Sequence, residues 1–220
     1  MTWYADEVIT LGTAEAVRAV REDPLLAPFA HHVKNPLRHH WHTPEVTHAL
    51  PEAGLVVVRP VCDASMDDGA AEWFGEPVLD WARFPDRSRR SPRVERERVA
   101  NECSHDSTIL PPAALLAHLE SLAVSARVPF VFYSCCMFGG DAEIELAWVL
   151  GPSEEAVFAS RNPEVPGERR PVAVLEPDEP TRVVTGDVLV LALTHLGLEL
   201  PTPYFALHTR NFPWREHELR

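Results

Sequence analysis

The sequence predicts an α+β fold, built on a mixed but mainly antiparallel sheet with two to four helices. The segment 128–150 has the pattern of a β-hairpin, further strand-length apolar runs follow it, and few segments show helical periodicity. With 220 residues, the chain is long enough to form one large domain. We therefore expect a single domain over 1–220, with an irregular N-terminal lobe at 1–82, an arginine-rich connector at 83–98 and a more regular C-terminal lobe at 99–220.

The first half of the chain predicts two strands and a helix. A short strand is expected at 3–11, followed by a helix that Thr13 is suited to cap. The proline-containing stretch 28–52 is expected to be irregular, and the β-branched run GLVVVRPV at 54–61 predicts a strand. The charged sequence RVERERVANEC, at the end of the connector, is interpreted as a solvent-facing edge strand.

The second half has clearer patterns. Pro111 and Pro112 suit the first turn of a helix whose leucines recur at helical spacing. The apolar run 128–137 and the alternating sequence 143–150 predict the two strands of the hairpin, the first of them buried on both faces. In the second of these strands, Glu143 and Glu145 are expected to point outward.

Three elements are expected after the hairpin. Strands are predicted at 156–160 and 170–177. A largely apolar helix is predicted at 186–197, with Thr185 as its N-cap and Gly197 at its C-terminal end. Because this helix is apolar on nearly all sides, we expect it to be buried.

The charge of the chain limits the classes of partner. Its formal net charge is -13, although the connector 83–98 holds seven arginines against three carboxylates. Such acidity disfavours binding to nucleic acids and to anionic membrane surfaces, and it favours a basic protein partner. The alternative is that acidity only maintains solubility. The N-terminus has neither the basic residues nor the apolar core of a secretory signal, so we expect a cytoplasmic protein.

Two groups of residues are candidates for a partner surface. The acidic stretch 63–80 contains Asp67, Asp68 and Glu72, and Asp141, Glu143 and Glu145 form an acidic ladder with the period-2 spacing of one strand face. This ladder could instead hold a divalent cation or be the solvated side of a strand. Aromatic residues near the C-terminus, represented by Tyr204 and Trp214, could anchor a partner or a second copy of the chain, or could close the core.

A histidine cluster provides the candidate metal site. Six histidines lie within 31–48, and His31, His32, His40 and His42 are the strongest candidate ligands. Imidazole is a good ligand for zinc and for other divalent transition metals. The opposing interpretation is that this polar stretch carries exposed histidines without a ligand role, and the main expectation is that no cofactor is bound.

Sequence motifs of common enzyme classes are absent. The chain contains no GxGxxG, GxxxxGK[ST], GxSxG or HExxH. Cys103, His105 and Asp106 supply the residue types of a nucleophilic triad, but they stand too close in sequence to assemble one. Cys135 and Cys136 are interpreted as reduced, buried thiols.

These observations favour a non-enzymatic acidic protein that binds a basic partner, with the general character of an immunity or inhibitor protein. The alternative hypothesis is a metal-dependent hydrolase, or a metal-binding protein, that uses the histidines of 31–48.

Overall fold

The computed structural model describes nine segments of the chain: residues 2–34, 37–39, 46–48, 50–61, 93–103, 110–138, 141–161, 171–198 and 214–219. Ten strands lie in these segments: β1 (Thr2–Leu11), β2 (Ala30–Val33), β3 (Leu37–His39), β4 (Val46–His48), β5 (Leu55–Val61), β6 (Phe130–Phe138), β7 (Asp141–Leu150), β8 (Glu155–Arg161), β9 (Pro171–Leu175) and β10 (Arg182–Thr185). The helices are α1 (Ala14–Glu22), α2 (Arg96–Cys103), α3 (Ala113–Ala126) and α4 (Val188–Thr194), with two 3₁₀ helices, η1 (Ala27–Phe29) and η5 (Trp214–His217).

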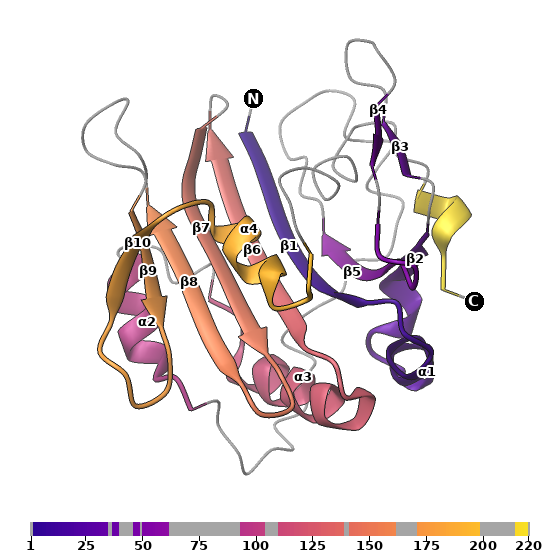
Figure 1. Ribbon diagram of the computed structural model, residues 1–220, viewed down its shortest axis with the longest axis horizontal. Coiled ribbons are helices and arrows are strands. Elements are labelled where there is room, and N and C mark those ends of the chain that lie inside the picture. The colour runs from indigo at the N-terminus through magenta and orange to yellow at the C-terminus, as the bar shows by residue number, and fades with distance from the viewer. Residues whose placement is uncertain are drawn as a thin grey trace.

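Eight of the strands form one antiparallel sheet, which confirms the α+β fold class. Their order is β10-β9-β8-β7-β6-β1-β5-β2, and β3 and β4 form a separate pair (Figure 1). The N-terminal strand β1 lies in the interior of this sheet, between β6 and β5. Strands from both expected lobes are therefore hydrogen-bonded within the same sheet.

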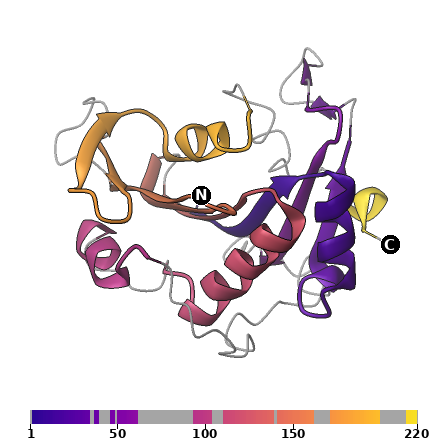
Figure 2. The ribbon, with the colours of Figure 1, turned by 60° about the horizontal axis from the view of Figure 1, so that its bottom comes forward.

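Helices cover both faces of the sheet (Figure 2). Helix α4 packs on one face, which we call the α4 face, and α1, α2 and α3 pack on the other. Strand β7 has apolar residues on both of its faces. Ala147 and Val149 are buried in the core on the α4 face, and Leu146 and Trp148 are buried in the core on the opposite face. A strand with two covered faces needs apolar residues at successive positions, which explains the nearly continuous apolar sequence of β6 and β7.

The hairpin and most other elements lie where the sequence predicts them. Strands β6 and β7 pair antiparallel, with Phe132 opposite Trp148. The Thr13 side chain accepts a hydrogen bond from the backbone N–H of Ala16 and caps α1, as expected. Gly197 follows α4 with φ +68°, a left-handed conformation that favours glycine.

Three expectations about local structure are wrong. The charged sequence at 93–103 contains helix α2 rather than an edge strand, and the stretch 28–52 contains strands β2, β3 and β4. The N-cap of α4 is Asp187, whose carboxylate accepts from Val190 N at 3.0 Å, and not Thr185, which ends the unexpected strand β10. Asp187 is the better cap because its carboxylate accepts a charge-assisted hydrogen bond at the positive end of the helix.

Asp23 joins the C-terminal end of α1 to α3. Its Oδ1 accepts hydrogen bonds from the backbone N–H groups of Leu25 and Leu26, each at 2.9 Å. Its Oδ2 accepts from His118 Nε2 at 2.6 Å. Burial acts to raise the pKa of Asp23, but the hydrogen bond and charge of His118 and the two backbone bonds outweigh it, so the pKa is lowered from 3.8.

Asp23→Asn is expected to reduce the acid sensitivity of the fold. A carboxyl group with a lowered folded-state pKa stabilises the fold above its unfolded pKa, and this stabilisation is lost as the pH falls through the folded value. Asparagine can still accept the two backbone bonds but has no charge to pair with His118. Urea unfolding across the acid range should show a weaker loss of stability below about pH 4 for the variant, whereas Glu22→Gln, at an exposed neighbouring position, should behave as wild type. If Asp23→Asn and wild type lost the same amount of stability over the acid range, Asp23 would not be the source of this pH dependence.

Candidate functional site

The structure places part of the histidine cluster at one edge of the sheet. His31 and His32 lie on β2, and His32 Nε2 donates a hydrogen bond to the carbonyl of Ala53 at 2.8 Å. His40 and His42 lie outside the described residues. Within the described segments, no three His, Cys, Asp or Glu side chains are grouped so that they could hold a metal ion. The metal site of the sequence analysis thus stays a prediction.

The outward orientation expected for Glu145 is wrong. Its side chain is only 6% exposed and accepts a hydrogen bond from the Tyr133 hydroxyl at 2.9 Å. The alternation of β7 was predicted correctly, but both faces of the strand are covered, so the polar positions of its central part do not meet solvent. Asp141 and Glu143 begin the same strand, and their side chains lie outside the described part of the structure.

The remaining candidates for a partner surface are not placed. Asp67, Asp68, Glu72 and Tyr204 lie outside the described residues. Trp214 is the first residue of η5, but its side chain is not among those described. These residues stay candidates from the sequence alone.

Sequence reasoning missed a row of polar side chains buried across the middle of the sheet. Register places Glu7 opposite Tyr133 and Glu145 opposite Ser160, and Glu7 pairs with Arg59 at 3.2 Å. Burial, and then the adjacent Cys135 and Glu145, raise the pKa of the Tyr133 phenol well above its usual value. The phenol therefore stays protonated and donates to Glu145, so these groups stabilise one another within the core.

Cys103 is poorly suited to nucleophilic catalysis. It is buried at the end of α2, and burial together with the nearby Glu102 raises its pKa to about 12. Because the thiolate is the reactive form, the protonated thiol is a weak nucleophile. His105 and Asp106, the other two residues of that candidate triad, lie outside the described segments.

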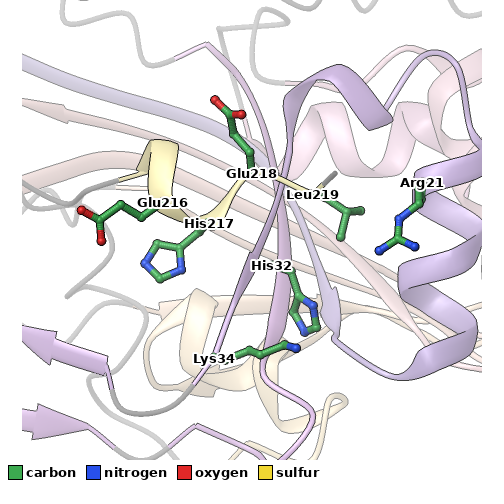
Figure 3. A pocket seen from close by; sticks show the side chains of 7 residues that line it. All are labelled: Arg21, His32, Lys34, Glu216, His217, Glu218 and Leu219. Atoms are coloured by element: carbon green, nitrogen blue, oxygen red, sulfur yellow. The ribbon is translucent and has the colours of Figure 1, made fainter.

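His32 does line a cavity, together with residues that the sequence did not connect to it. The cavity has a volume of about 620 Å³ and lies where the C-terminal end of α1, strand β2 and the segment 216–219 meet (Figure 3). We call it the β2 pocket; its lining residues are Arg21, His32, Lys34, Glu216, His217, Glu218 and Leu219. The segment 216–219 is held there because Leu219 N donates to Ala30 O at 2.9 Å and Glu218 bridges to His31.

Gly12 allows the His32 ring to reach its position in this pocket. A Cβ atom at residue 12 would collide with both the Ala53 carbonyl and the His32 ring. Burial lowers the pKa of His32; the bond to Ala53 opposes this effect, and the charges of Lys34 and Arg21 add to it. Burial is the main cause of the lowered pKa of His32, and Lys34 and Arg21 lie close enough to add to it.

The opposite edge of the sheet has a different character. Strand β10 ends the strand order, and no strand among the described residues pairs with its outer side. Val183 at its centre is 67% exposed, although it is a large apolar residue. At the other edge, by contrast, Glu218 and Leu219 bond to β2.

Exposed carboxylates flank β10. Asp178 and Glu179 lie in the turn that precedes it, and Asp187 follows it. The nearby cations are already bonded, since Arg182 pairs with Glu176 at 2.7 Å and Arg98 donates to the backbone carbonyls of this turn. None of the ion pairs within the described residues uses the three flanking carboxylates. We call Val183 with Asp178, Glu179 and Asp187 the β10 edge surface.

Comparisons of this chain with protein-family models, curated proteins and solved structures found no match. None of the helices that the structure describes combines the length and the apolar character needed to cross a membrane. The functional conclusions below therefore depend on the chain's own residues.

Proposed function

We propose that this protein is a non-enzymatic binding protein that neutralises a basic protein partner in the cytoplasm, in the manner of an immunity or inhibitor protein. The observation that carries the proposal is the β10 edge surface, an edge strand whose outer side pairs with no strand in the described segments and whose exposed valine lies between carboxylates. The net charge of -13 supports the same class of partner.

An open edge strand provides unpaired backbone donors and acceptors, so an extended segment of a partner can add to the sheet. Alternate side chains of such a segment would face Val183 and the carboxylates around it. Complementary charge chiefly accelerates the encounter and excludes acidic competitors, while the backbone bonds and the buried valine supply affinity. A lysine- or arginine-rich strand of the partner meets both requirements.

The internal placement of reactive groups also supports binding rather than catalysis. Tyr133 and Glu145 are bonded to each other in the core, and the Cys103 thiol has a raised pKa. Asp23 is likewise held by three hydrogen-bond donors. These groups stabilise the fold, and the metal-dependent alternative has no comparable support among the described residues.

The proposal predicts that changing the β10 edge surface removes a basic partner. The test variant is Asp178→Lys/Glu179→Lys/Val183→Asp. The matched control is Glu15→Lys/Glu22→Lys/Val124→Asp, which changes the same number of exposed charges on α1 and a second exposed valine on α3. Each immobilised protein is incubated at low salt with a lysate of the encoding organism, and the retained proteins are identified by mass spectrometry.

A basic protein should be retained by the wild type and the control, bind the test variant at least about tenfold more weakly, and be released as the salt concentration rises. Equal retention by the test variant, or a partner that is acidic and insensitive to salt, would refute the proposal. Thermal unfolding of all three proteins establishes that the substitutions leave the fold intact.

A further inference from the structure

The β2 pocket brings two cations and two histidines together in a chain that is strongly acidic overall, with two carboxylates, Glu216 and Glu218, also in its lining. Arg21 contributes from α1, Lys34 follows β2, and His217 contributes from η5. Lys34 is the only lysine of the chain. Three segments that are distant in sequence thus bring an arginine, a lysine and two histidines, His32 and His217, to one cavity.

The two cations of the pocket have no bonding partner in the part of the chain that the structure describes. No hydrogen bond or ion pair connects the side chains of Arg21 and Lys34 to any other residue that the structure describes. Figure 3 shows the carboxylates of Glu216 and Glu218 directed away from the side on which His32 and Lys34 lie. As far as the described residues go, two positive charges therefore remain available to a ligand.

The histidines supply further polar groups at the same place. Burial lowers the pKa of His217, and so does the nearby His32, although Glu216 and a hydrogen bond to the His32 main chain act in the opposite direction. Both imidazoles are therefore mainly neutral at neutral pH. When an anion enters, each can take up a proton and so gain a second N–H hydrogen-bond donor. The positive charges also oppose a divalent metal ion, because Arg21 and Lys34 would repel it from His32.

We propose that the β2 pocket binds a dianionic phosphate group, either as free phosphate or as part of a small organic phosphate. A dianion neutralises the two charges of Arg21 and Lys34. An arginine guanidinium bonds to phosphate oxygens in a bidentate manner, and a lysine ammonium adds a point charge. A volume of about 620 Å³ exceeds the space that phosphate alone needs and lies within the range of small-molecule pockets.

The acidity of the rest of the chain does not prevent this binding. Charges separated by more than about 8 Å are largely screened at physiological ionic strength. The groups that line the pocket therefore determine its local potential: Glu216 and Glu218 belong to the lining, but their carboxylates point away from His32 and Lys34 (Figure 3). Distant carboxylates mainly affect the rate at which an anion approaches.

The test is a calorimetric titration of the full chain with inorganic phosphate, phenyl phosphate, succinate and zinc chloride in separate experiments. The test variant is Arg21→Gln/Lys34→Gln, and the control is Arg18→Gln, which removes an exposed arginine of the same helix that does not line the pocket. Lys34→Arg keeps the charge, and NMR shifts of the His32 and His217 rings locate the ligand.

Saturable phosphate binding at one site should weaken at least about tenfold in the double variant and by less than about twofold in Arg18→Gln and Lys34→Arg. Tighter binding of phenyl phosphate would identify an organic phosphate as the ligand, and equal binding would identify free phosphate. The proposal is wrong if phosphate does not bind, if the double variant binds it as wild type does, if succinate binds equally well, or if zinc alone shifts both rings.

Discussion

Replacing Glu155 by alanine is expected to destabilise the fold by about 3 kcal/mol, because it leaves buried hydrogen-bond donors without an acceptor. The carboxylate of Glu155 accepts from Arg93 N at 2.6 Å, from Val94 N at 3.2 Å and from the Trp148 indole N–H at 3.0 Å. It thereby attaches the segment before α2 to the sheet beneath. Alanine would remove all three bonds and leave a cavity beside Trp148.

The exposed neighbour provides the control for this prediction. Glu154→Ala removes an exposed carboxylate whose one hydrogen-bond partner among the described residues is His195 at 3.2 Å, so its cost should be less than about 1 kcal/mol. Equilibrium unfolding in urea measures both variants. Similar losses for the two glutamates would show that Glu155 is not the attachment point for Arg93 and Val94.

The pH dependence of Glu155 should have the opposite sign to that of Asp23. Burial raises the pKa of Glu155 from 4.5, although the bonds from Trp148, Val94 and Arg93 oppose this effect. A raised carboxyl pKa means that the folded state binds the proton more tightly. Its stabilising contribution is therefore present below the unfolded pKa and decreases as the pH rises through the folded value.

Replacing Gly54 by alanine is expected to destabilise the fold by about 3 to 4 kcal/mol, since strain and steric collision combine at this residue. Gly54 has φ +73°, a left-handed conformation that an L-residue adopts at a cost. A Cβ atom there would also collide with the carbonyl of Val33 on the neighbouring strand. The backbone of β2 would have to move, because a carbonyl of a paired strand cannot rotate away.

Gly197 serves as the control that separates the backbone strain from the steric collision. It has φ +68°, but a Cβ atom at this position would meet nothing within 4 Å among the described atoms. Gly197→Ala should therefore destabilise the protein by only about 1 kcal/mol, the cost of the left-handed conformation. If guanidinium unfolding midpoints shift equally for Gly54→Ala and Gly197→Ala, the collision with Val33 contributes nothing.

The sequence predicted the elements whose signals are local. The apolar run of β6 and the alternation of β7 identify the hairpin, and Thr13 identifies the start of α1. Helix α2 was missed because its many charges were interpreted as protection of an edge strand. The helical signal was present, however, since Val99 and Cys103 are four residues apart and both are buried on the same face.

The candidate sites depend on contacts that no local pattern reveals. His32 was singled out, but its proximity to Arg21 follows from the packing of α1 beside β2, and its proximity to His217 follows from the pairing of the C-terminal segment with β2. Glu145 was assigned to solvent because a single strand does not show what covers its second face. The exposed position of Val183 depends on β10 being last in the strand order, which is a property of the whole sheet.

The interior position of β1 has a consequence for the order of folding. Ile9 pairs with Val131, so β1 leaves the ribosome well before its partner strand β6 is synthesised. High contact order of this kind slows folding, because a long loop must close before the pairing stabilises it. During that interval Val8 and Ile9, which are fully buried in the finished fold, are exposed to the surroundings. The nascent chain is therefore a natural client for chaperones that shield apolar strands until the sheet can close around β1.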